Sequence, residues 1–175
     1  MNDDLQLRYP VGKFSPQETY SNTELGQFIE QIEKLPAEIQ KAVEGFTTQQ
    51  LDTTYRDGGW TARQVLHHVA DSHMNAYVRF KWTLTEETPV IKAYDEKAWA
   101  ETPEAKLDPV ISIELLHALH KKWTTLMRQL DPIALSRKYV HPDTGREMPL
   151  NRMIAMYAWH GQHHLGHIRL VANKS

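Results

Sequence analysis

Four of the ten histidines of this 175-residue chain fall within nine positions near its C-terminal end, in the stretch WHGQHHLGH, residues 159–167. In a helix, residues four positions apart lie on one face, with their Cβ atoms about 5–6 Å apart. Two imidazoles at that spacing can bind a single metal ion. The stretch contains two such pairs, His160/His164 and His163/His167. Its composition and spacing therefore predict metal binding by ring nitrogens.

The two pairs differ in their position on the predicted helix. The apolar residues of this segment recur at helical spacing, and His160 and His164 fall along that inward stripe. His163 and His167 lie to one side of it, so we expect the first pair to face the core. A zinc protease does not fit, because Gly161 follows His160 where His-Glu-x-x-His enzymes need a glutamate as general base.

A third ligand is expected from another helix, because catalytic zinc sites typically have three protein ligands and one open position. The stretch LHHVADSH contains three candidates, His67, His68 and His73. His68 lies beside apolar neighbours and is preferred on spacing, whereas His67 is expected in a more exposed neighbourhood. His73 also follows the apolar face and stays a candidate. The alternative is that these histidines are hydrogen-bonded core residues without a metal.

Three other histidines and one carboxylate complete the set of candidates. His117 and His120 belong to a predicted third helix and are interpreted as solvated. His141, in the loop that follows, either covers the pocket or lies on the surface. Asp71 is a candidate for orienting a ligand imidazole, with a place on the helix surface as the alternative.

The composition restricts the classes of protein and site. The chain has no cysteine, which excludes disulfides, cysteine-type zinc sites and a cysteine nucleophile, so a metal needs nitrogen and oxygen ligands. The net charge of −2 gives no reason to expect nucleic acid as a partner. No apolar stretch is long enough for a bilayer, and the N-terminus has no secretory pattern, so we expect no membrane contact and a cytoplasmic location.

Four amphipathic segments predict the architecture. The first opens at the capping-box pattern Ser15–Glu18 and extends to Phe46, with Pro36 expected to kink or break it. The second opens at the capping box of Thr61 and Gln64 and ends near residue 84. The third opens at Asp108-Pro109, with a core stripe of Leu115, Leu116, Leu119, Trp123, Leu126 and Leu130. The fourth covers roughly residues 150–171.

The remaining segments are interpreted as connections. Residues 86–108 are expected to be a structured link, and residues 131–149 a small hairpin around an Asp-Thr-Gly turn. Residues 1–175 are therefore predicted to form a single all-α domain, a four-helix bundle with a small hairpin insertion before the last helix.

Three stretches resemble the DinB/YfiT-like family of bacterial four-helix proteins: YRDGGWTARQVLHHVADSH, RFKWTLTEETPVIKAYDEKAW and YAWHGQHHLGHI. The resemblance covers nearly the whole chain and implies a DinB-like metal-binding domain with a three-histidine site. In this family the first ligand follows the helix-opening tryptophan by eight residues and precedes an aliphatic residue. Trp60 and the His68-Val69 pair match that pattern, so the resemblance implies His68, and the later pair maps onto His160 and His164.

The resemblance also implies an activity. Family members are described as metal-dependent hydrolases, are often homodimers, and include relatives of bacillithiol S-transferases. We therefore expect one divalent ion per chain, zinc first, with nickel or another first-row metal as alternatives. The function expected first is transfer of a bacillithiol-type thiol to small electrophiles by a metal-activated thiolate. A metal-dependent hydrolase and a non-catalytic metal-binding or sensing bundle are the alternatives.

Candidate substrate-binding residues come from the loops and from the last helix. Arg56 and Tyr94 could line a pocket rim, and Tyr157 lies one turn before His160. Their alternative roles are structural: Arg56 in capping the second helix, Tyr94 in packing the connection and Tyr157 in the core. The sequence identifies no general acid or base.

Overall fold

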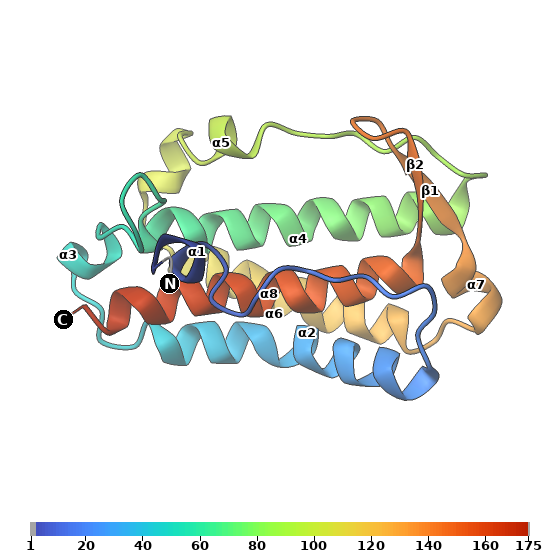
Figure 1. Ribbon diagram of the computed structural model, residues 1–175, viewed down its shortest axis with the longest axis horizontal. Coiled ribbons are helices and arrows are strands. Elements are labelled where there is room, and N and C mark those ends of the chain that lie inside the picture. Colours follow the sequence, from blue (N-terminus) through green and yellow to red (C-terminus); the bar gives the residue numbers. More distant parts are fainter. Residues whose placement is uncertain (1–2, 175) are drawn as a thin grey trace.

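Four long helices form the body of the protein, a computed structural model of which describes residues 3–174. They are α2 (Asn22–Ala42), α4 (Ala62–Thr85), α6 (Val110–Met127) and α8 (Leu150–Ala172) (Figure 1). α2 packs on α6 and α8, and α4 packs on the same two helices, so the consecutive helices α2 and α4 occupy opposite corners. α4 and α8 are neighbours that run in opposite directions (Figure 1). The predicted all-α four-helix bundle is confirmed.

Short elements connect and cover the long helices. The strands β1 (Lys138–His141) and β2 (Arg146–Pro149) form an antiparallel hairpin, as predicted, with Tyr139 opposite Met148. Gly145 has a φ of +62° at its turn, a conformation that glycine adopts without steric cost. The short helices are α1 (Asp3–Arg8), α3 (Thr48–Leu51), α5 (Glu96–Trp99), the 3₁₀ helix η1 (Pro103–Lys106) and α7 (Pro132–Ser136). None of the described helices is long and apolar enough to cross a membrane.

The first long helix begins later than its sequence pattern predicted. Ser21, and not Ser15, is the N-cap of α2: its Oγ accepts from Glu24 N, and Glu24 Oε2 accepts from Ser21 N. Both serines precede a glutamate by three residues, but only Ser21 directly precedes the continuous apolar periodicity. The capping box predicted for the second helix is confirmed, with Thr61 and Gln64 bonded reciprocally at the start of α4.

Pro36 lies inside α2 and does not break it, contrary to the sequence expectation. Proline has no amide proton, so the carbonyl four residues earlier, that of Ile32, loses its helical donor. The ring of His120 on α6 supplies a replacement, because its Nδ1 lies 2.5 Å from Ile32 O. The bond lost within the helix is therefore replaced by one between helices.

The core consists of two apolar clusters with polar side chains between them. Along α4 one cluster ends at Ala70 and the other begins at Ala76. Along α6 the first cluster ends at Leu116 and the second begins at Trp123. Imidazoles that are buried or partly buried occupy these gaps. We call the rings of His73, His120 and His160, together with the Ile32 carbonyl, the histidine layer.

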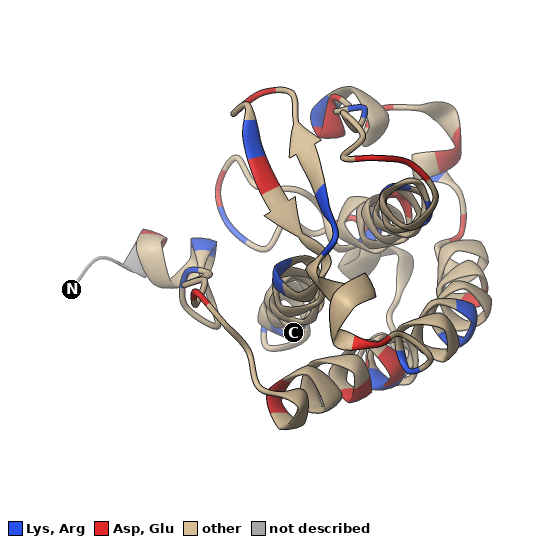
Figure 2. Cartoon of the chain, turned by 90° about the vertical axis from the view of Figure 1, so that its right-hand side faces the viewer, with Lys and Arg blue, Asp and Glu red and all other residues tan. Residues whose placement is uncertain are grey.

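The N-terminal segment, residues 3–12, covers part of α8, and the sequence analysis did not assign it to an element. α1 packs on α8, and Figures 1 and 2 show the segment lying beside that helix. The indole Nε1 of Trp159 donates to Gly12 O at 3.0 Å, and a Cβ at Gly166 would lie 2.7 Å from Pro10 Cγ. The side of α8 that carries His163 and His167 is therefore covered by this segment.

The exposed fractions of two side chains on α6 differ from those expected from the sequence. Leu115, predicted for the core stripe of the third helix, is 42% exposed, while Ile113 takes an inward position. His120, interpreted as solvated, is 1% exposed. The inward face of α6 is set by its two partners, α2 and α4, and hydrophobic periodicity alone does not fix that rotation.

Replacing Gly161 with alanine should destabilise the bundle. A Cβ there would overlap Leu35 Cδ2, and Leu35 is only 1% exposed and cannot move into solvent. We expect Gly161→Ala to lower the unfolding free energy by about 1–3 kcal/mol in urea titrations. Gly26→Ala on α2, where a Cβ meets no atom within 4 Å, is the matched control and should stabilise by about 0.4–1 kcal/mol.

The contact between the two helices can be isolated by a double-mutant cycle. If the overlap with Leu35 is the cause, Gly161→Ala should cost less in a Leu35→Ala background than in the unmodified chain. Equal costs in both backgrounds would contradict the close packing of α2 on α8.

Candidate metal centre

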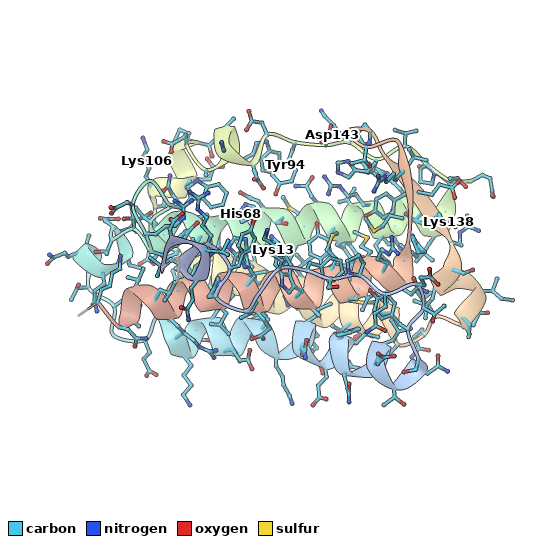
Figure 3. All side chains as sticks on the ribbon, in the orientation of Figure 1. Lys13, His68, Tyr94, Lys106, Lys138 and Asp143 are labelled. Carbon is cyan, nitrogen blue, oxygen red and sulfur yellow. The ribbon has the colours of Figure 1, made fainter. Side chains whose placement is uncertain are left out.

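The structure brings together the three histidines that the sequence analysis selected. One ring nitrogen from each of His68 on α4 and His160 and His164 on α8 lies within 4.8 Å of the others. The ring centre of His68 is 5.4 Å from that of His160 and 4.8 Å from that of His164. α4 and α8 are antiparallel neighbours, so the first part of α4, which carries His68, lies beside the middle and second half of α8, which carry His160 and His164. Figure 3 labels His68 in this part of the bundle.

Burial keeps these three rings neutral. It lowers the pKa of His68 to about 4, with the nearby His163 adding a smaller effect. The pKa values of His160 and His164 are also lowered well below the usual range, by burial first and by neighbouring imidazoles second. Neutral rings have free lone pairs at pH 7, and three such donors fit a first-row divalent ion such as zinc. The residues present therefore fit the expected metal.

The loop before α4 positions His68. The ring of Trp60 lies against it, with ring centres 4.6 Å apart. A bridge between Thr54 and Thr61 closes this loop, and a Cβ at Gly59 would lie 2.9 Å from Arg56 Cγ. Glycine at this position permits the tight approach that directs the tryptophan onto the histidine.

His67, one residue earlier, has different partners. Its Nδ1 lies 2.8 Å from Ser112 Oγ and its Nε2 lies 3.4 Å from Leu107 O. Its ring is buried, not in the exposed neighbourhood that was expected, but it belongs to neither group of potential metal ligands. The preference for His68 over His67 as a member of the cluster agrees with this geometry.

A second group of histidines shares one member with the first. His163, His164 and His167 also offer ring nitrogens within 4.8 Å of one another. His163 and His167 are 8% and 2% exposed, because the N-terminal segment covers them. The His167 ring stacks on Tyr55, with centres 3.8 Å apart, and its Nε2 lies 3.3 Å from Arg8 O. The His163/His167 spacing was visible in the sequence, but the covering segment was not.

Further histidines contact the rings of the proposed ligands. His73 Nε2 lies 3.2 Å from His160 Nδ1, and His73 Nδ1 lies 2.9 Å from His120 Nε2. His73, which the sequence left open as a third ligand, is a neighbour of His160 and belongs to neither group of potential metal ligands found among the described residues. Burial raises the pKa of Asp71 to about 6, but no hydrogen bond found within residues 3–174 joins this carboxylate to a ligand ring.

Two cavities meet at His160. The first, of about 430 Å³, is lined by His68, His164, Trp60 and Arg56, and we call it the Arg56 cavity. The second, of about 530 Å³, includes Ser72, Arg79, Tyr94, Tyr157 and His141, and we call it the Tyr94 cavity. Both are also bordered by Glu96, Lys97, Trp159 and His160.

The three candidate substrate-binding residues thus lie on two sides of the histidine cluster. Arg56 borders the first cavity, and its Nε is buried without a hydrogen-bond partner. Tyr94, labelled in Figure 3 on the connection beside α4, and Tyr157 border the second. Burial raises the pKa of both tyrosines, so both keep their hydroxyl protons at neutral pH. The acidic and basic residues of the connection form part of the rim, whereas Trp99 packs on Tyr94.

Comparisons with known proteins identify relatives along nearly the whole chain. Residues 31–168 match the family described as the DinB superfamily. The "Putative metal-dependent hydrolase YfiT" of Bacillus subtilis is 49% identical over 165 residues, covering 94% of this chain and 93% of the relative. A relative of the same description from Oceanobacillus iheyensis is 48% identical over 161 residues, covering 92% and 93%.

Two solved structures are also similar. YfiT from Bacillus subtilis, described as having an unusual four-helix bundle topology, superimposes with a TM-score of 0.94 at 48% identity, covering 97% of each chain. A mycothiol-dependent maleylpyruvate isomerase has a TM-score of 0.55 at 17% identity, covering 79% of this chain and 60% of the isomerase. The second likeness concerns the fold alone.

Removal of any one ligand should release the metal. We expect His68→Ala, His160→Ala and His164→Ala each to lose most of the bound metal, measured by elemental analysis of the purified proteins. His67→Ala and His163→Ala should retain it, since neither belongs to the first group. Loss of metal in His163→Ala with retention in His68→Ala would assign the metal to the second group instead.

The metal-free protein should lose stability as the pH falls from about 6.5 toward 4. Histidines of the unfolded chain bind protons below a pKa of 6.5, whereas burial holds the pKa values of His68 and His120 at about 4 in the folded state. Between these values the unfolded state binds more protons, so acid favours unfolding. Asp71, with its pKa raised to about 6, contributes with the opposite sign.

Urea titrations across this pH range measure the effect. His120→Gln should have a shallower pH profile than the unmodified protein, because one buried imidazole no longer titrates. An unfolding free energy that stays constant between pH 7 and 4.5 would contradict neutral buried rings.

Proposed function

The chain belongs to the DinB superfamily, and from this we propose that it is a metal-dependent enzyme that transfers a small thiol to an electrophile. The observation that supports this proposal is the meeting of two cavities at His160. A two-substrate transfer needs a place for each reactant beside the same centre. The histidines belong to neighbouring helices of a packed bundle, which limits their movement relative to both cavities.

The proposed metal ligands are His68, His160 and His164, with zinc as the first expectation and nickel as an alternative. A bound divalent ion would supply positive charge that lowers the pKa of an adjacent thiol or water, so that its deprotonated form is available at neutral pH. Each candidate group found among the described residues has three members, which leaves a coordination position for a reactant.

The sulfur must come from a cosubstrate, because the chain has no cysteine. In the transfer, the thiol proton leaves to solvent, the sulfur forms a bond to the electrophilic carbon, and the bond from that carbon to its leaving group breaks. Arg56 and Lys97 place positive charge at the rim of the Arg56 cavity, which suits a thiol carrying carboxylates, as bacillithiol does. Tyr94 and Tyr157 place protonated hydroxyls in the Tyr94 cavity, where they can donate to a leaving group.

A hydrolase is the second candidate function. The relatives at 48–49% identity are named for metal-dependent hydrolysis, and water can take the position that the thiol would occupy. A non-catalytic metal-binding or sensing bundle is a weaker candidate, because the two cavities give access to the cluster, whereas structural zinc sites have four protein ligands and no open position.

One assay separates these functions. Purified protein is mixed with bacillithiol and a chromogenic electrophile, with and without a metal chelator, and compared with a chromogenic ester supplied without thiol. Conjugate formation that requires both thiol and metal is expected, and His160→Ala should reduce it by at least about 100-fold if the centre activates the nucleophile. Metal-dependent ester cleavage without conjugate formation would replace the transferase with a hydrolase, and the absence of both reactions would contradict an enzyme of either kind.

A further inference from the structure

The direction of each hydrogen bond in the histidine layer follows from its last acceptor. A backbone carbonyl only accepts, so the His120 Nδ1 that faces Ile32 O carries a proton. A neutral imidazole has one N–H, so His120 Nε2 is an acceptor and the proton between it and His73 belongs to His73 Nδ1. By the same reasoning, His73 Nε2 accepts from His160 Nδ1. The remaining nitrogen of His160, Nε2, therefore has its lone pair free.

A second chain of hydrogen bonds fixes His164 in the same way. Arg8 O accepts from His167 Nε2 at 3.3 Å, which leaves His167 Nδ1 as an acceptor. His167 Nδ1 lies 3.4 Å from His164 Nδ1, so the proton between them belongs to His164. His164 Nε2 is then also left with a free lone pair.

We propose that His73, His120 and His167 are positioning residues that hold both ligand histidines of α8 as Nδ1–H tautomers, leaving each Nε2 free for the metal. This inference rests on the metal site of the proposed function. Metal-ligating histidines in proteins usually donate their second ring N–H to a neighbouring acceptor, and that acceptor sets the tautomer and the orientation of the ring. Here the acceptors are other imidazoles.

Both chains of hydrogen bonds end at a backbone carbonyl that has no donor within its own helix, so each carbonyl is available to accept from a histidine. Pro36 has no N–H to offer Ile32 O, although both lie within α2. Arg8 is the last residue of α1, and the final carbonyls of a helix have no partner within it. Because neither carbonyl can donate, neither chain can reverse while its rings stay neutral.

The tautomers can be read without metal or substrate. The metal-free protein, labelled with ¹⁵N-histidine, is studied by two-bond ¹H–¹⁵N correlation NMR near pH 7.5, where protonated and unprotonated ring nitrogens have separate shifts. His160, His164, His73 and His120 should each be protonated on Nδ1, and His167 on Nε2. An Nε2–H tautomer for His160 or His164 in the unmodified protein would overturn the proposal, whatever the enzymatic activity turns out to be.

Two substitutions test the chains separately. His73→Phe should abolish the single Nδ1–H tautomer of His160 and leave that of His164, whereas His167→Phe should do the reverse. Each should weaken metal binding by about 10–100-fold, measured by competition with a chelator. His73→Gln retains both an acceptor and a donor, and should preserve more of the affinity than His73→Phe.

His67→Phe is the matched control, because His67 is buried on the same helix as His73 but bonds to Ser112. It should change neither tautomer nor affinity. Equal loss of affinity in His67→Phe and His73→Phe would assign the effect to packing and overturn the positioning role. A second equivalent of bound metal that depends on His163 and His167 would also overturn it, because His164 Nδ1 would then be a ligand.

Discussion

Hydrogen bonds between imidazoles in the core constrain how the four long helices of this bundle fit together. A polar group without a partner in an apolar core costs about 1–3 kcal/mol, and several imidazoles lie here between two apolar clusters. Each of the four long helices contributes one member of the histidine layer: Ile32, His73, His120 and His160. A shift of any helix by one turn would separate a donor from its acceptor, so the layer fixes the register of all four.

That register creates the candidate metal centre. α4 and α8 are distant in sequence but adjacent in the bundle, because the consecutive helices α2 and α4 occupy opposite corners. Gly161 permits α8 to approach Leu35 of α2 closely on one side, while α4 packs on another and brings His68 to His164. The close packing that glycine allows and the convergence of the ligands are therefore two aspects of one helix placement.

The parts that depend on local sequence could be predicted, and the parts that depend on distant contacts could not. Helical periodicity and the His160/His164 spacing are local, and the resemblance to a family selected His68. The partner of His120 is 88 positions away, and Pro36 looked like a helix breaker until that partner was known. The first capping box was misplaced because two serine–glutamate pairs have the same spacing. The burial of His163 and His167 depends on the N-terminal segment, whose sequence has no strong helical pattern.

The hydrogen-bond chains also select between the two groups of histidines on α8. His164 belongs to both groups, but a neutral imidazole offers one lone pair. A proton on its Nδ1, held toward His167, directs that lone pair to the side of His68 and His160 and withdraws His164 from the second group. Without Arg8 O as the last acceptor, His167 could donate from Nδ1 to His164 Nδ1, which would place the His164 proton on Nε2 and remove its free lone pair from the first group. The N-terminal segment, far from the proposed metal ligands in sequence, thus contributes to deciding which histidines of this helix would bind a metal.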